Sequence, residues 1–305
     1  MEVTLHSYAK INIGLRLLGK RKDGYHDIET IFQLIDLNDT LVFKRLQSDS
    51  VQLSCSDSSI PLDKANLVYQ AFIHYRKMMQ IEGGVNVAIE KRIPAGGGLG
   101  GGSSNAAATL QACELLWNKS TPKHVLHRMA FEIGSDVPFF LSGGTALGKG
   151  RGEDLTPLIL ADEFWIVLVC PGFSVSTKWA YSQSKIGLTN TQKIGTLRAL
   201  FNETKVHTWR ESAVNELESV VFTRHPELQR IKTQFYEKDA FYASMSGSGS
   251  TMYGLFHNRT AAESAVTFFS KYKMHVLLAR PISNQISGRQ QSNRIDISED
   301  NHGNH

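Results

Sequence analysis

A glycine-rich run near residue 100 constrains this chain more than any other feature. It follows an alternating apolar stretch at 85–89 and precedes an alanine-rich stretch at 106–117, an order typical of strand, loop and helix. Glycines let a backbone turn sharply and approach an anion closely, and the free amides at a helix N-terminus favour negative charge. The run therefore predicts a site for a phosphate-bearing ligand. It reads Pro94, Ala95, Gly96, Gly97, Gly98, Leu99, Gly100, Gly101, Gly102, Ser103, Ser104 and Asn105.

Three other interpretations of the run are disfavoured. A flexible linker is not usually set between a strand and a helix with an apolar Leu99 inside it. The dinucleotide-binding glycine pattern is present, but it needs a strand ending in an acidic residue about 20 positions later, where 116–122 reads as a helix end and a loop. No lysine follows these glycines as in a P-loop, and a near match at 143–149 has Gly150 where a hydroxyl is needed.

Composition narrows the class of protein. The chain has 305 residues, of which 41% are hydrophobic and 20% charged, as in ordinary globular proteins. A net charge of +4 without a basic run among aromatics argues against nucleic acid as a partner. Three isolated cysteines fit buried thiols in a reducing compartment, and neither a signal peptide nor an apolar run of about 20 residues is found. We therefore expect a cytoplasmic protein, a monomer or weak homodimer, with no membrane partner.

Strand-like and helix-like stretches mix along the chain without regular βαβ alternation, which predicts an α+β architecture. Residues 1–170 are expected to form a first domain that contains the glycine run. Helical stretches dominate after residue 171, so 171–282 are expected to form a second domain. The tail at 283–305 is rich in Ser, Asn, Gln and charge, which predicts disorder.

Two charged residues are candidates for acid–base chemistry. Lys10 lies in a strictly alternating stretch at 3–18, on one face with Tyr8 and Asn12. Such a lysine is commonly solvated, although the adjacent Asn12 also fits the wall of a polar cleft. Asp136 lies in a loop, where it can cap a turn or helix or, beside an ammonium group, deprotonate or orient an attacking hydroxyl. The spacing alone does not show that Lys10 and Asp136 meet.

Two further segments have a plain and a functional interpretation. Tyr25 and His26 follow an Asp-Gly turn, so they close a hairpin or offer a ring and an imidazole that stack on and hydrogen-bond a base. The small-residue loop at 246–250 is either a simple turn or a second wall around the same anionic ligand.

As a set, these motifs resemble the superfamily of galactokinase, homoserine kinase, mevalonate kinase and phosphomevalonate kinase. The glycine run is similar to its phosphate loop and 245–249 to its third motif. Further segments, spread from about residue 5 to about residue 280, resemble specifically the 4-diphosphocytidyl-2-C-methyl-D-erythritol kinases. They are 9–12, 23–26, 66–67, 91–94, 134–138, 150–153 and 171–172.

The resemblance implies two domains with the active site in the cleft between them. It also implies transfer of the γ-phosphate of ATP, with Mg²⁺, to the 2-hydroxyl of 4-diphosphocytidyl-methylerythritol, a step of the non-mevalonate route to isoprenoids. Asp136 would be the catalytic base and Lys10 its partner. Residues 94–104 would hold the ATP phosphates, and Asn66 and Lys91 would lie by the nucleotide.

For the metal, the resemblance implies Ser103 or Ser104. The substrate side would consist of Asn12, Tyr25, His26 and Tyr181. Tyr181 often appears as Phe in this family, and 215–218 read Asn-Glu-Leu-Glu rather than the usual Asn-Asp-x-Glu.

Two alternatives remain open. Another kinase of the superfamily would act on a mevalonate-like or homoserine-like alcohol, which carries no base for Tyr25 and His26 to hold. A nucleotide-binding regulator without catalysis would not need both Lys10 and Asp136.

Overall fold

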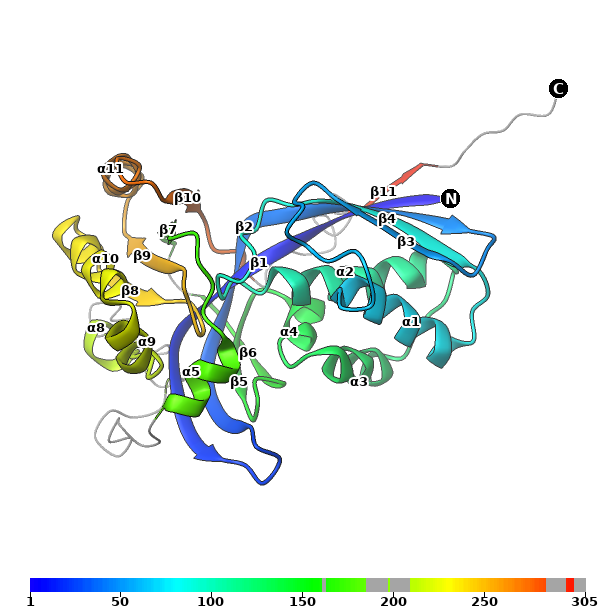
Figure 1. The fold of residues 1–305 in the computed structure, drawn as a ribbon, viewed down its shortest axis with the longest axis horizontal. Coiled ribbons are helices and arrows are strands. Elements are labelled where there is room, and N and C mark those ends of the chain that lie inside the picture. Colours follow the sequence, from blue (N-terminus) through cyan, green and yellow to red (C-terminus); the bar gives the residue numbers. More distant parts are fainter. Residues whose placement is uncertain (161–162, 185–196, 198–208, 284–294, 299–305) are drawn as a thin grey trace.

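Two sheets, each covered by helices, make up the fold (Figure 1). The structure is a computed structural model and describes residues 1–160, 163–184, 197, 209–283 and 295–298. The larger sheet has seven strands in the order β11-β1-β2-β4-β3, with β5 paired to β2 and β6 paired to β5. These strands are β1 (Glu2–Lys20), β2 (His26–Leu46), β3 (Val51–Cys55), β4 (Gly84–Glu90), β5 (Thr145–Lys149), β6 (Asp154–Leu158) and β11 (Ile295–Ser298).

Four helices pack on the larger sheet, and their buried residues share one core with β1, β2 and β4. They are α1 (Leu67–Met79), α2 (Gly101–Leu116), α3 (Lys123–Ile133) and α4 (Val137–Ser142). The helix α1 begins where the side chain of Asn66 accepts a hydrogen bond from the amide of Val68, a typical N-cap. In contrast, the N-cap residue of α2 is Gly100, which has no side chain to cap the helix, so the amides of its first turn remain available.

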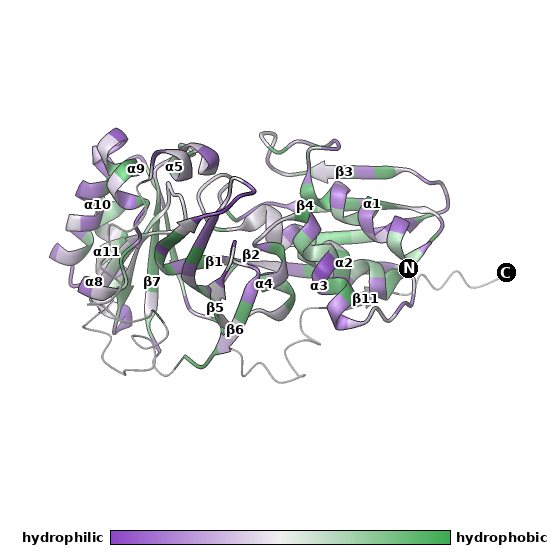
Figure 2. Ribbon diagram, turned by 90° about the horizontal axis from the view of Figure 1, so that it is seen from below, coloured by the Kyte–Doolittle hydropathy of each residue, from purple (hydrophilic) through white to green (hydrophobic). Residues whose placement is uncertain are grey.

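The smaller sheet has the strand order β10-β7-β9-β8, with antiparallel neighbours throughout. Its strands are β7 (Trp165–Cys170), β8 (Tyr242–Met245), β9 (Met252–Phe256) and β10 (His275–Ala279). The helices of this half are α5 (Thr177–Gln183), α8 (Trp209–Ser212), α9 (Glu218–Arg224), α10 (Pro226–Glu237) and α11 (Arg259–Phe269). Figure 2 shows hydrophobic strands such as β7 in the interior and helices banded in both colours around them, as amphipathic helices require.

One long hairpin links the two halves. Strands β1 and β2 pair from Glu2 opposite Lys44 to Lys20 opposite His26, with three register shifts on the way. Bulges of this kind bend a strand and re-aim its side chains. The first shift lies between Tyr8 and Lys10, so the strand bends just where Lys10 lies.

Three details differ from the sequence analysis. Strand β7 belongs to the smaller sheet, so the second half already begins at Trp165 and not at residue 171. Strict alternation of burial ends at Ala9, and 9–17 are buried throughout because both faces of β1 are covered there. Within the expected disordered tail, Ile295–Ser298 pair with the edge of β1, whose free backbone groups accept another strand.

Two findings bear on the class of protein. No helix in the described part of the chain is long and apolar enough to cross a membrane. Cys55, Cys113 and Cys170 are free, and burial raises the pKa of the Cys113 and Cys170 thiols. Those two thiols are therefore unreactive, whereas Cys55 is only half-buried.

Candidate active site

The glycine run turns into α2 through left-handed backbone, as its composition predicts. Gly98 and Gly100 have φ values of +79° and +72°, which favour glycine strongly. A Cβ on Gly98 would lie 2.1 Å from the carbonyl oxygen of Ser246, so no side chain fits there. The run is therefore pressed against the second small-residue loop.

A hollow of about 340 Å³ lies over the glycine run. Asn66 and Lys91 line it together with 94–103, so the structure brings these expected ATP-side residues together. Both side chains also have structural partners. The amide of Asn66 caps α1 and donates to Pro61, and the Lys91 ammonium lies 2.5 Å from the buried carboxylate of Asp39.

Lys10 is the most confined charge in the site. Its side chain is only 4% exposed, so it forms a cleft wall rather than a solvated face. Its Nζ donates to Asn12 Oδ1 at 2.6 Å and to the carbonyl oxygen of Gly98 at 2.9 Å. The same Nζ lies 3.5 Å from Asp136 Oδ2, which establishes the proximity that spacing did not. The Phe32 ring, 5.6 Å from Nζ, adds a cation–π contact that the sequence analysis did not include.

Asp136 immediately precedes α4. It occupies the N-cap position at the end of a turn, but its backbone is helical and its side chain makes no capping hydrogen bond, so the carboxylate is not used as a cap. The side chain is 31% exposed. It lines a larger hollow of about 890 Å³. A carboxylate that is open on one side and beside an ammonium on the other can accept a proton from a bound hydroxyl.

Asn12 is held in place from two directions. Its Oδ1 accepts from Lys10, and its Nδ2 donates to Thr30 Oγ1 at 3.0 Å. The Thr30 hydroxyl in turn donates to the carbonyl oxygen of Gly14 at 2.6 Å. This chain of bonds fixes which end of the Asn12 amide faces Lys10, and Thr30 is a second residue that the sequence analysis missed.

Aromatic side chains also line the larger hollow. Tyr25 and His26 come from the tip of the β1–β2 hairpin and Tyr181 from α5, and the His26 and Tyr181 rings lie 5.5 Å apart. Tyr25 is 52% exposed. The guanidinium of Arg151 lies 3.6 Å from the centroid of its ring. Arg151 went unassigned, although it belongs to the segment 150–153 that carried part of the resemblance.

Burial and nearby charges shift the pKa values of two of these residues. Burial, followed by the charge of Lys20, lowers the pKa of His26, so its imidazole is neutral at pH 7. Burial, followed by Asp136, raises the pKa of the Tyr181 phenol, which therefore keeps its proton. Both side chains thus offer uncharged hydrogen-bonding groups.

The loop at 246–250 closes the site from the smaller sheet. Ser246 Oγ donates to the carbonyl oxygen of Gly98 at 2.9 Å, and the amide of Thr251 donates to that of Gly97 at 3.2 Å. A Cβ on Gly247 would lie 3.5 Å from Lys10 Nζ, so this glycine stands directly beside the ammonium. The loop does contain a turn, in which the amide of Gly249 donates to the carbonyl oxygen of Ser246 at 2.9 Å, and this turn packs against the glycine run and Lys10.

The two serines differ in access. Ser103 lines both hollows, whereas Ser104 is only 3% exposed and lines neither. The described residues contain no group of three or more His, Cys, Asp or Glu side chains that could hold a metal ion. Mg²⁺ is commonly held by one or two protein oxygens together with substrate phosphates, so Ser103 fits this arrangement and Ser104 does not.

Comparison with known proteins identifies the family. Residues 66–144 match the family model for the GHMP kinases N terminal domain, and 197–273 match that for the GHMP kinases C terminal domain. A protein of Enterococcus faecalis named 4-diphosphocytidyl-2-C-methyl-D-erythritol kinase is 38% identical, over 92% of this chain and 100% of its own. A protein of Prosthecochloris aestuarii with the same name is 40% identical, over 86% and 92%.

Two solved structures extend the comparison. The crystal structure of a 4-(cytidine 5'-diphospho)-2C-methyl-D-erythritol kinase has a TM-score of 0.75 and 32% identity, covering 92% of this chain and 99% of that one. The homoserine kinase of Cytophaga hutchinsonii has a TM-score of 0.76 at 19% identity, covering 93% and 95%. At 19% identity the homoserine kinase is evidence for the fold alone, and it agrees with the expected α+β architecture.

Proposed function

The chain belongs to the 4-diphosphocytidyl-2-C-methyl-D-erythritol kinases, a family of GHMP kinases, and from that membership we propose that it phosphorylates the 2-hydroxyl of 4-diphosphocytidyl-2-C-methyl-D-erythritol with ATP. This reaction is a step of the non-mevalonate route to isoprenoid precursors. The observation that carries the proposal in this molecule is the Lys10–Asp136 pair, which lies where the glycine loop meets the larger hollow.

The reaction needs a base and a positive charge close to the attacking hydroxyl and the γ-phosphate. Asp136 Oδ2 takes the proton of the substrate's 2-hydroxyl group. The oxygen of that hydroxyl bonds to the γ-phosphorus of ATP, and the bond from this phosphorus to the leaving oxygen of ADP breaks. The Lys10 ammonium, 3.5 Å from the same carboxylate oxygen, stabilises the charge that develops on the transferring group. Asn12 holds Lys10 and contacts the substrate near the reacting hydroxyl.

On the ATP side, the first turn of α2 offers its uncapped amides to the phosphates, as a helix N-terminus does for anions. Residues 94–104, Asn66 and Lys91 form this side. Mg²⁺, when bound with ATP, neutralises phosphate charge. We assign the Ser103 hydroxyl as its protein ligand because Ser103 faces both hollows.

On the acceptor side, Tyr25, His26 and Tyr181 hold the cytosine. Neutral hydrogen-bonding groups on aromatic planes suit an uncharged pyrimidine, and mevalonate or homoserine has no ring to fill this end. We further propose that the chain acts as a monomer or weak homodimer. We also propose a cytoplasmic location, which the two buried, unreactive thiols support.

The test is ADP release with Mg-ATP and each of three alcohols: 4-diphosphocytidyl-methylerythritol, mevalonate and homoserine. We expect turnover on the cytidyl substrate alone, with a new phosphomonoester signal in the phosphorus NMR spectrum of the product. Turnover on mevalonate or homoserine instead would identify a sibling kinase. ATP binding without turnover on any of the three would identify a nucleotide-binding regulator.

A further inference from the structure

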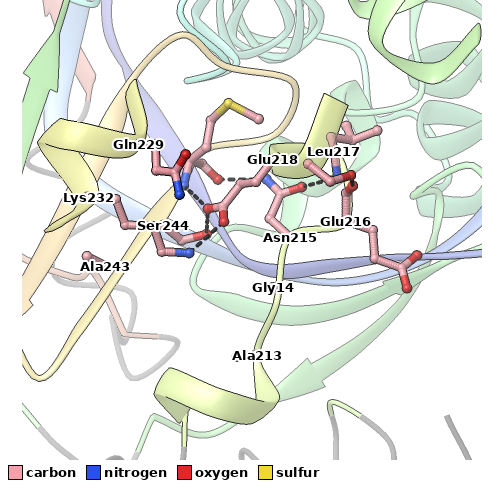
Figure 3. A network of polar contacts seen from close by, with 12 residues as sticks. Gly14, Ala213, Asn215, Glu216, Leu217, Glu218, Gln229, Lys232, Ala243 and Ser244 are labelled. Carbon is pink, nitrogen blue, oxygen red and sulfur yellow. Dashed lines mark hydrogen bonds and ion pairs between the residues drawn. The ribbon is translucent and has the colours of Figure 1, made fainter. Parts of the chain in front are cut away.

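A buried polar cluster outside both hollows connects three parts of the molecule (Figure 3). It consists of Asn215, Glu216 and Glu218, at the start of α9, and we call it the 215–218 clamp. All three side chains are at least nine-tenths buried, although Asn, and Glu above all, are mostly exposed in proteins. None of the three lines either hollow of the site, so their burial needs another explanation.

Asn215 holds the loop at 246–250 from behind. Its Nδ2 donates two hydrogen bonds, to the carbonyl oxygens of Met245 and Gly247, both at 2.8 Å. Its Oδ1 accepts from the amide of Leu217 at 3.0 Å, which fixes the direction of the side-chain amide. One donor of this buried amide therefore goes to the last residue of β8, and the other goes to the loop that stands beside Lys10.

Glu218 fixes the strand that leads into the same loop. Its Oε1 accepts from Ser244 Oγ and from the amide of Met245, both at 2.8 Å. Its Oε2 lies 2.5 Å from Lys232 Nζ on α10, which balances the buried charge. In Figure 3 these contacts converge on one carboxylate between α9, α10 and β8.

Glu216 connects the clamp to β1. Its Oε2 accepts from the amide of Leu17 at 2.6 Å, and its own amide donates to the carbonyl oxygen of Leu15 at 2.8 Å. Strand β1 also carries Lys10 and Asn12. The clamp thus ties the strand with the catalytic lysine to the loop that faces it.

The loop at 246–250 has two backbone amides that can donate hydrogen bonds to a ligand. Gly247 and Ser248 are buried and line the larger hollow, yet their backbone amides donate to no group in the described part of the chain. Buried amides are normally paired, and unpaired ones beside a site for anions are donors held ready for a ligand. Asn215 holds the carbonyl of Met245, which precedes these amides in the chain, and the carbonyl of Gly247, which shares a peptide group with the Ser248 amide. Their positions therefore depend on Asn215.

We propose that the 215–218 clamp is a positioning device for phosphoryl transfer, which sets the amides of Gly247 and Ser248 against Lys10 and Asn12. The inference rests on the kinase function proposed above. The three residues touch no reactant. They act through the loop and through β1, so they affect the rate of transfer more than the binding of ATP or the acceptor.

The first test compares two Asn→Ala variants in the second half. Asn215→Ala removes the bonds to the loop, whereas Asn258→Ala removes a cap of α11, where Asn258 accepts from the amide of Ala261 at 2.9 Å. Both variants should lower the melting temperature. We expect kcat to fall roughly ten- to hundredfold in N215A only, with KM for ATP and for the acceptor within about threefold of the unchanged chain.

The second test uses the Glu218–Lys232 pair, in case N215A does not fold. Glu218→Ala and Lys232→Met both break this ion pair and both cost stability, but only E218A releases Ser244 and the Met245 amide. We expect kcat to fall about tenfold or more in E218A and less than about threefold in K232M. A kcat that follows the melting temperature across all four variants, or an unchanged kcat in N215A and E218A, would overturn the proposal.

A third measurement does not depend on activity. Hydrogen exchange followed by mass spectrometry should show faster exchange in peptides covering 245–251 of N215A or E218A, and unchanged exchange across 94–104. Equal protection of 245–251 in variant and unchanged chain would refute the clamp. Failure of the unchanged chain to phosphorylate the cytidyl substrate would instead refute the proposed function, and the two failures are thus distinguishable.

Discussion

The two hollows of the site are built in opposite ways. The smaller one is formed mainly by one continuous stretch, 94–103, whose backbone and following helix supply what an anion needs. The larger one is assembled from distant segments that contribute Lys10, Tyr25, Asp136 and Gly247. A site for a common ligand such as ATP can be built from the backbone of one local segment. A site for a particular acceptor requires side chains that only the tertiary fold brings together.

Asp136→Asn should show the largest difference between the two hollows, because it should lower kcat strongly and leave ATP binding largely intact. The amide cannot take the hydroxyl proton, so kcat should fall by roughly 10²- to 10⁴-fold, the usual contribution of a general base. ATP affinity, measured by calorimetry, should remain largely unchanged because Asp136 does not line the smaller hollow. The matched control is Asp154→Asn, an exposed carboxylate on β6. Turnover surviving in D136N would remove Asp136 from the role of essential base.

Gly98→Ala should weaken the binding of both ATP and the acceptor, because Gly98 lines both hollows. Its new Cβ would meet the Ser246 carbonyl oxygen at 2.1 Å, with φ at +79°, so the two loops must separate. We expect a loss in kcat of about a hundredfold and higher KM values for both substrates.

Gly19→Ala is the control for this variant, since a Cβ there meets nothing within 4 Å. It should leave kinetics unchanged and alter stability by less than about 1 kcal/mol. If G98A affected only the acceptor, the two hollows would not share this wall in solution.

The same contrast explains what the sequence could predict. The glycine run and the first turn of α2 followed from local rules, because glycine conformation and helix termini depend on near neighbours. The contact between Lys10 and Asp136 did not follow, since it joins β1 to a loop 126 positions later. Before the resemblance was considered, the sequence offered only candidates here.

Two other differences come from long-range packing. Burial of 9–17 on both faces of β1 arises in part because its apolar side chains pack against β7 and β9 of the smaller sheet, a long-range contact that no alternation pattern reveals. Arg151 was missed because an arginine in a glycine-rich turn has no distinctive pattern, and its role appears only where its guanidinium lies over Tyr25. The motif at 150–153 was the one available signal.

Tyr25→Ala should affect the larger hollow alone. Loss of one aromatic surface under a base costs about 1–3 kcal/mol, so KM for the cytidyl acceptor should rise about tenfold or more while KM for ATP stays constant. Steady-state kinetics with each substrate varied in turn measures both. Tyr272→Ala, at another exposed tyrosine, is the control. A parallel rise in both KM values would contradict a stacking role for Tyr25.

The smallest expected effect concerns the pH dependence of acceptor binding through His26. Burial and then Lys20 lower its pKa, so the folded protein keeps the imidazole neutral to a lower pH than the unfolded chain does. Its contribution to stability is therefore present above the ordinary pKa of about 6.5 and lost as the pH falls through the lowered value.

KM for the acceptor should accordingly stay flat down to about pH 6.5 and rise only below the lowered pKa of His26. Lys20→Met removes part of the cause, so the rise should begin at a higher pH, and proton NMR should show the His26 titration moving in the same direction. In His26→Gln this component of the pH dependence should disappear. KM for ATP should not depend on pH over this range in the unchanged chain or in either variant. An identical His26 titration with and without Lys20 would show that burial alone sets its protonation, and the acceptor side would then owe its neutral imidazole entirely to packing.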